Sequence, residues 1–240
     1  MREHTSAART AGILYITGTV AGVLTKVVVM PPVSEASDPL AASAQHTGAV
    51  VTGALRVLVM GLSLAFVPIV RFPVLRRVDE RLAIGYLIMR GAVETACYVL
   101  SAISLLLLLP LGEVMSAGPG TAAPAGIRLG ALLADNADVG AVLAFVFCLG
   151  GIVFYLLLYR SGIVPRWISL WGLAAVPFYV AAYLLAMYAV IGPNSTELNL
   201  LVIPLGVQEM VLAVWMIARG FRPAAVATTS DLGATPLVRS

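Results

Sequence analysis

Residues 86–104, YLIMRGAVETACYVLSAIS, decide the fold of this chain. They belong to a long apolar run, yet Arg90 and Glu94 stand four residues apart within it. As a helix, the run is long enough to cross the roughly 30 Å hydrocarbon core of a bilayer. An ionisable side chain at that depth costs roughly 2.5–3.5 kcal/mol even on insertion scales, so it usually faces a bundle interior or a cavity. This segment is therefore the best indication of where a functional site lies.

The composition of the whole chain indicates a membrane protein. Of the 240 residues, 60% are hydrophobic and 11% are charged, and the mean hydropathy is +0.97. Soluble domains are about 45–50% apolar and about 25% charged, so that class is excluded. The net charge of +3 does not indicate nucleic acid as a partner, because the basic residues gather at the ends of apolar runs. We expect the lipid bilayer to be the main partner.

Six apolar runs predict an all-α fold, a polytopic membrane helix bundle with about six transmembrane helices. The expected spans are residues 11–30, 47–70, 82–111, 137–159, 167–191 and 199–218. They form one transmembrane domain, residues 11–222, between an N-terminal segment of residues 1–10 and a tail of residues 223–240. The Thr, Ser, Ala and Pro content of the tail predicts disorder. Within the first span, Gly18 and Gly22 predict a face on which another helix packs closely.

The distribution of arginine predicts the orientation of the bundle. Basic residues recur at alternate ends of the expected spans: Arg2, Arg9, Arg71, Arg76, Arg77, Arg81, Arg160, Arg166, Arg219 and Arg222. The opposite loops hold Arg128 and several carboxylates. By the positive-inside rule, we expect both termini to be cytoplasmic. The protein is expected to be a multi-pass protein of the cell (inner or plasma) membrane.

Ionisable residues on three different spans are expected at a similar depth. Counted from the basic residues at the ends of their helices, Glu209 lies about 15 Å deep and Glu94 about 20 Å deep. Arg56, on the second span, reaches a comparable depth. Two arginines and two glutamates balance in charge, as an apolar solvent demands. We therefore hypothesise one buried charge cluster, formed by Arg56, Arg90, Glu94 and Glu209.

Helical spacing places further polar side chains on the same stripe of the third span as Arg90 and Glu94. These side chains are Tyr86, Tyr98, Ser101 and Ser104. Arg90 and Glu94 can also pair directly along the helix. Two interpretations stay open for this pair: a structural salt bridge that helps dock helices, or one wall of a polar pocket at mid-membrane depth.

Several kinds of chemistry lack the residues that they need. The histidines are His4, near the N-terminus, and His46, in a loop, so a haem held by two intramembrane histidines is excluded. Cys97 and Cys148 lie in apolar runs and are expected to be packed as small hydrophobic side chains. The chain has no phosphate-binding glycine loop, and a nucleophilic triad lacks its histidine. We expect no cofactor and no bound metal.

A set of short motifs resembles a known family. They are Ala8-Arg9-Thr10-Ala11-Gly12-Ile13-Leu14-Tyr15, Arg90-x-x-x-Glu94, Tyr159-Arg160-Ser161-Gly162 with Pro165-Arg166, and Gln208-Glu209 with Ala218-Arg219-Gly220. In these motifs the chain resembles a bacterial multi-pass membrane family, domain of unknown function family 4386, from Ala8 to Phe221. The resemblance implies a six-helix integral membrane fold and no settled chemistry. Family members often carry histidine in the fourth helix, whereas residues 136–149 contain none, which argues against a histidine-based role.

The sequence predicts function only as a class. We expect an integral membrane protein with a buried polar and charged site at mid-membrane depth. One alternative is a membrane enzyme acting on a lipophilic small molecule, isoprenoid or lipid-like, such as a terpene cyclase or isomerase. Glu94 or Glu209 would then be the catalytic general acid. The second alternative is a small-solute or proton-coupled transporter that uses the same carboxylates. The oligomeric state is left open.

Overall fold

The computed structural model describes residues 2–116, 124–135, 137–192 and 195–221 of the chain. All regular structure in these residues is helical, and six of the helices are long and apolar enough to cross a membrane. This confirms the predicted all-α membrane bundle with six spans. The orientation of the termini stays a prediction, and the tail of residues 223–240 lies outside the described residues.

The helices follow one another in this order. The first, α1 (Arg2–Leu24), continues into a π-helical segment, η1 (Thr25–Val29). Two short helices, α2 (Pro31–Ser34) and α3 (Pro39–Gln45), lead to α4 (Thr47–Leu75). The third span consists of α5 (Glu80–Tyr86), the π-helical segment η2 (Leu87–Val93) and α6 (Glu94–Ser116). The remaining helices are α7 (Pro124–Asp135), α8 (Ala137–Ser161), α9 (Arg166–Met187) and α10 (Thr196–Arg219).

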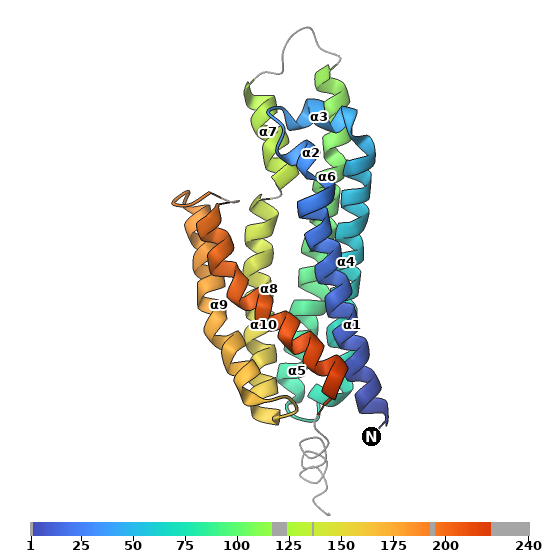
Figure 1. Ribbon diagram of the computed structural model, residues 1–240, viewed down its shortest axis with the longest axis vertical. Helices are drawn as coiled ribbons and strands as arrows, with labels where there is room; N and C mark the ends of the chain where they lie inside the picture. Colours follow the sequence, from blue (N-terminus) through green and yellow to red (C-terminus); the bar gives the residue numbers. More distant parts are fainter. Residues whose placement is uncertain (1, 117–123, 136, 193–194, 222–240) are drawn as a thin grey trace, which may run out of the picture.

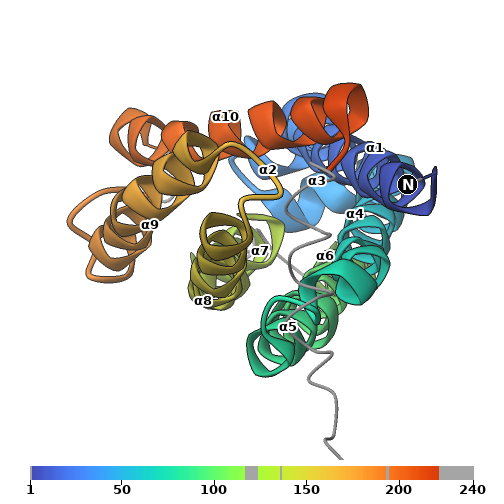
Figure 2. The same cartoon turned by 90° about the horizontal axis from the view of Figure 1, so that it is seen from below.

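The long helices form two groups that α10 connects. In one group α4 packs between α1 and α6, and in the other α8 packs against α9 (Figure 1). α10 lies against α9 and also against α1, so it bridges the two groups. The view from below shows this arrangement (Figure 2). The short helices α2, α3 and α7 lie together at the end of the molecule opposite to the N-terminus (Figure 1).

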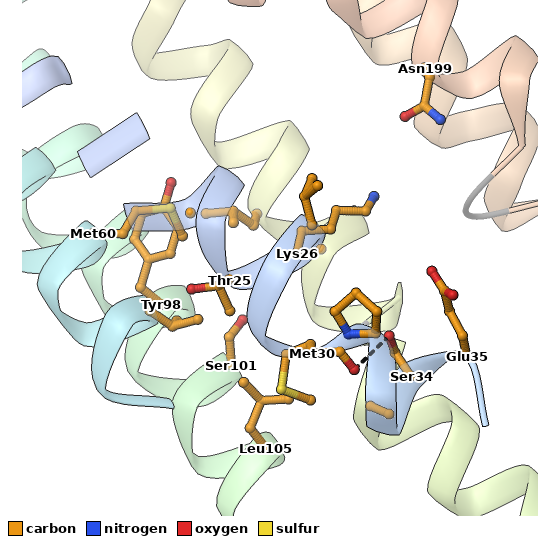
Figure 3. Close-up of a pocket in the computed structure, with 17 residues that line it drawn as sticks. Thr25, Lys26, Met30, Ser34, Glu35, Met60, Tyr98, Ser101, Leu105 and Asn199 are labelled. Atoms are coloured by element: carbon orange, nitrogen blue, oxygen red, sulfur yellow. Dashed lines mark hydrogen bonds between the residues drawn. The ribbon is translucent and has the colours of Figure 1, made fainter. Parts of the chain in front are cut away.

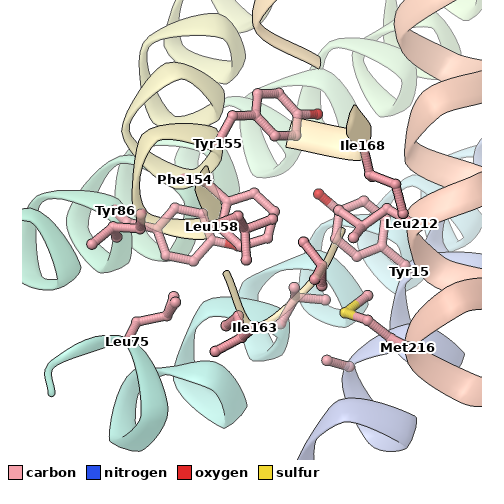
Figure 4. Packing of buried hydrophobic residues seen from close by; sticks show 14 of the residues in the cluster. Tyr15, Leu75, Tyr86, Phe154, Tyr155, Leu158, Ile163, Ile168, Leu212 and Met216 are labelled. Atoms are coloured by element: carbon pink, nitrogen blue, oxygen red, sulfur yellow. The ribbon is translucent and has the colours of Figure 1, made fainter. Parts of the chain in front are cut away.

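Two hydrophobic clusters fill the bundle, one toward each end. The first cluster draws buried residues from all six spans, including Tyr15, Phe154, Ile168 and Leu212 (Figure 4). The buried members of the second cluster come from the α1–α4–α6 group and the short helices near it, and none of them belongs to α9 or α10. The two groups are therefore packed together near the N-terminal end of α1 and diverge toward the other end.

The second span is longer than its hydropathy predicts. α4 ends at Leu75, five residues beyond the expected end at Val70, and its last turns contain Arg71. We expected Arg71 among the basic residues beyond the end of this span, but it lies inside α4 and is 0% exposed, so that expectation is wrong. The helix continues beyond Arg71 because Val74 and Leu75, in its last turn, are buried in the first cluster.

Glycines let α1 approach two neighbouring helices closely. A Cβ on Gly18 would lie 2.9 Å from the Leu64 side chain of α4, and a Cβ on Gly22 would clash with the Met60 sulfur. The face that these two glycines predict is therefore the contact with α4. On another side of α1, a Cβ on Gly12 would lie 2.7 Å from the carbonyl oxygen of Ala213 on α10. Side-chain-free positions of this kind let helix backbones come together in membranes.

Replacing Gly12 with alanine is expected to lower the thermal stability, because the added methyl group clashes with the backbone of α10. Backbone atoms, unlike a side chain, cannot relieve the clash by changing rotamer. Overpacking of this kind costs about 1–3 kcal/mol. The measurement is the midpoint of thermal unfolding in detergent micelles. Gly206→Ala on α10 is the control, since a Cβ there meets no atom within 4 Å. Equal stability of the two variants would contradict the close contact between α1 and α10.

Candidate functional site

The site is built around Arg90, which lies in η2 and is 4% exposed. Its Nη1 lies 3.0 Å from Glu94 Oε2, and its Nη2 lies 3.2 Å from Glu209 Oε1. Nη2 also donates a hydrogen bond of 2.6 Å to the Tyr15 hydroxyl, which donates one of 3.0 Å to Glu209 Oε1. One guanidinium thus joins α1, the third span and α10. We call Tyr15, Arg90, Glu94 and Glu209 the junction network.

The backbone around Arg90 is unusual on both sides. In η2 the helix widens to a π-helix, and the Glu94 amide donates to the carbonyl of Met89. Such segments are rare and are often found at functional sites. On the facing helix, a Cβ on Gly150 would lie 2.6 Å from Arg90 Cγ, so the arginine stem lies against bare backbone of α8. The guanidinium then lies 4.3 Å from the ring centre of Phe147, in a cation–π contact.

A second buried arginine lies beside the junction network. Arg71 donates hydrogen bonds of 3.1 Å to the Tyr86 hydroxyl and of 3.1 Å to the Met216 sulfur. Its guanidinium also lies over the ring of Phe154, at 4.5 Å, and over the ring of Tyr15, at 5.0 Å. Tyr15 therefore contacts both buried arginines. Their two positive charges balance the two glutamates of the junction network.

An uncharged polar group ties α8 and α9 to α10 at the same level. Gln208 is 0% exposed and accepts a hydrogen bond of 2.8 Å from the Tyr155 hydroxyl. Its amide nitrogen donates one of 2.9 Å to the carbonyl oxygen of Ile168. Because a buried amide without partners is costly, these two bonds hold α10 in register with its neighbours. With them, all six spans contribute to one polar layer.

The structure brings together three of the four charges expected in the cluster. Arg90, Glu94 and Glu209 are in contact, whereas Arg56 is half-buried and forms no ion pair within the described ranges. Arg56 precedes Val57, a member of the second hydrophobic cluster, to which α10 adds no buried residue. Arg56 and Arg71 are fifteen residues apart on α4, or about 22 Å at the helical rise, so Arg56 lies at a different level from the polar layer. Arg71 is the second cation instead.

The predicted polar stripe divides at η2. Tyr86, before the π-helical segment, faces Arg71, while Tyr98, after it, donates a hydrogen bond of 3.3 Å to Glu94 Oε1. Ser101 follows Tyr98 on the wall of a cavity, and Ser104 is buried. A regular 3.6-residue repeat misses this change of partners, because the wider π turns rotate the residues that follow them.

The cavity encloses about 700 Å³ between the two groups of helices. Tyr98, Ser101 and Thr25 line it on one side, and Asn199 of α10 faces them across the space (Figure 3). Lys26 and Glu35 are exposed at its rim (Figure 3). The cavity lies on the level of the second hydrophobic cluster, to which α9 and α10 contribute no residue.

The next residues to consider are candidate metal ligands and the two cysteines. Within the described part of the chain, no three His, Cys, Asp or Glu side chains gather in a group that could hold a metal ion. Cys97 and Cys148 are free thiols. Glu94 and Glu209 are both turned toward Arg90, so the site presents a shared ion pair rather than an acidic ligand set.

Comparison with known proteins identifies the family of this chain. A family model described as a domain of unknown function (DUF4386) matches residues 10–220. The chain belongs to the DUF4386 family. The matched region contains the whole junction network, together with Arg71 and Gln208. No curated protein and no solved structure matches the chain.

Replacing Arg90 with leucine is expected to destabilise this DUF4386 protein strongly, because Glu94 and Glu209 lose the cation that they share. Removing one partner of a buried ion pair costs about 3–5 kcal/mol. Thermal unfolding and the yield of monodisperse protein in micelles measure the effect. Arg56→Leu is the control, and the loss of stability is expected to be far smaller. A larger loss of stability in Arg56→Leu than in Arg90→Leu would contradict the assignment of Arg90, and not Arg56, to the junction network.

A charge exchange tests the pairing between the third span and α10. Arg90→Glu and Glu209→Arg are each expected to abolish the folded yield, because each places like charges in contact. The double variant restores the charge balance across the two helices, so part of the yield is expected to return. No recovery at all would count against a direct pairing of these two side chains.

Proposed function

We propose that this protein binds an amphiphilic small molecule in the cavity and that the junction network responds to the occupant. We also propose that it does so in the bacterial cell membrane, with both termini in the cytoplasm. One observation carries the proposal. Tyr98 is part of the cavity wall and is also the hydrogen-bond donor to Glu94 of the junction network.

The size and lining of the cavity support an amphiphilic occupant. Its volume of about 700 Å³ lies within the roughly 300–1,000 Å³ typical of small-molecule sites. The apolar part of the lining suits a hydrocarbon body and includes Met30, Val57, Met60, Leu105 and Leu143. Three residues that carry hydroxyl groups, Thr25, Tyr98 and Ser101, line the same space, and Lys26 and Glu35 add charge at the rim. The cavity lining therefore offers polar groups for the head of an amphiphile and apolar side chains for its body.

A short chain of contacts links the cavity to the helix junction. An occupant that accepts a hydrogen bond from Tyr98 competes with Glu94 for that donor. Glu94 is paired with Arg90, which also holds Tyr15 and Glu209. Because these partners lie on three spans, a change at Tyr98 alters the balance of contacts that docks α10. A ligand shifts such an equilibrium by its difference in affinity for the two arrangements.

General-acid catalysis on the occupant has less support. A catalytic acid must come within about 2.6–3.2 Å of the group that it protonates. Glu94 is 0% exposed, and neither Glu94 nor Glu209 is among the residues that line the cavity. Transport would require a path through the polar layer, where the buried rings of Tyr15, Tyr86 and Phe154 pack together. We therefore favour binding over both alternatives.

Narrowing the cavity tests the proposal. Gly140 of α8 lines the cavity, and a Cβ there meets no atom within 4 Å, so Gly140→Phe directs a ring into the cavity without a backbone clash. Native mass spectrometry of protein released from membrane vesicles is expected to show a bound amphiphile on the wild-type chain. The Gly140→Phe variant is expected to lose that mass because its binding space is filled.

The control for this experiment is Gly48→Phe. Gly48 is exposed in the first turn of α4, lines neither the cavity nor a groove along α10, and has equally open surroundings. That variant is expected to keep the amphiphile. An empty wild-type protein, or equal retention by the Gly140 variant, would refute the proposed binding function.

A further inference from the structure

A second hollow lies outside the cavity and is not used by the proposed function. It is a groove of about 820 Å³ along α10, bounded by residues of α1 and α9. Its lining is almost entirely apolar and extends from Val202 to Arg219. The groove stays open at Gly206, where a Cβ would meet no atom within 4 Å.

The length and position of the groove point to a ligand from the bilayer. Val202 and Arg219 are seventeen residues apart on one helix, or about 25 Å at the helical rise. The hydrocarbon core is about 30 Å thick, so the groove follows α10 through most of it. Ile203, Val207 and Val214 are exposed large apolar side chains along this stretch. An acyl chain is the apolar partner that this environment supplies.

One end of the groove carries a positive charge. Arg219 is in the last turn of α10, is exposed, and forms no ion pair within the described residues. Trp215 lies one turn earlier on the same face and also lines the groove. Tryptophan and arginine together mark the level of the lipid headgroups. A guanidinium without a carboxylate partner matches the phosphate of a headgroup.

We propose that the groove between α1, α9 and α10 is a binding site for an anionic phospholipid. The headgroup phosphate lies at Arg219, and an acyl chain lies along α10 past Trp215 and Gly206. A zwitterionic phospholipid carries its own cation beside the phosphate, so it gains less from Arg219. Selectivity for lipid charge is therefore the property that separates this site from ordinary solvation by the bilayer.

Fluorescence of Trp215 tests the proposal. Replacing Trp167 and Trp171 with phenylalanine leaves Trp215 as the last of the three tryptophans. This protein is reconstituted in phosphatidylcholine vesicles that contain either brominated phosphatidylglycerol or brominated phosphatidylcholine, whose bromine atoms quench tryptophan on contact. Brominated phosphatidylglycerol is expected to quench Trp215 with about fivefold higher apparent affinity, as one arginine near an anionic surface predicts.

Three variants separate the groove from general charge attraction. Arg219→Gln is expected to abolish the difference between the two lipids, and Gly206→Phe to weaken quenching by both. Arg77→Gln is the matched control, because Arg77 is an exposed arginine that does not line the groove, and the preference is expected to persist. Equal quenching by both lipids before any change, or a preference that Arg77→Gln removes, would overturn the proposal. Protection of Trp215 from both lipids in a dimer, seen by size-exclusion chromatography, would overturn it as well.

Discussion

The bundle depends on one buried guanidinium that serves two carboxylates. Arg90 contacts Glu94 on its own helix and Glu209 on α10, and Tyr15 of α1 bridges the arginine and Glu209. An isolated ion in this apolar interior is costly, and its pairing offsets the cost only when the geometry is good. Because the partners come from different spans, ion pairing and helix packing form one event. α10 cannot separate from α1 and the third span without leaving charges unpaired.

The same layer marks a boundary between a closed end and a hollow end of the molecule. On one side the first hydrophobic cluster gathers residues from all six spans. On the other side the short helices pack against the α1–α4–α6 group. The N-terminus of α3 is capped by Asp38, whose side chain accepts hydrogen bonds of 3.1 Å from the Leu40 and Ala41 amides. The cavity lies in this hollow end, so the charged layer forms its border toward the packed end. This asymmetry is the reason why we connect the cavity with the junction network.

The sequence predicts the number of spans and part of the polar layer for clear physical reasons. Hydropathy over about 20 residues reports spanning helices, and the four-residue spacing of Arg90 and Glu94 predicts their pairing. Depth counting also identifies Glu209. It fails for Arg56, because the count starts from Arg71 as the end of the second span, whereas α4 continues to Leu75 and Arg71 itself lies at the polar layer. The apolar residues Phe72, Val74 and Leu75 after Arg71 were the available signal that α4 continues. Neither the π-helical segment nor the role of Tyr15 has a comparable signal in hydropathy or charge.

The balance of charges in the polar layer has a consequence for the electrical environment of the protein. Arg71, Arg90, Glu94 and Glu209, with their ordinary charges, sum to zero. A transmembrane potential does about 2.3 kcal/mol of work per elementary charge per 100 mV. For this layer the contributions cancel when it moves as a unit. A displacement of these four side chains together along the membrane normal therefore carries no net voltage-dependent cost.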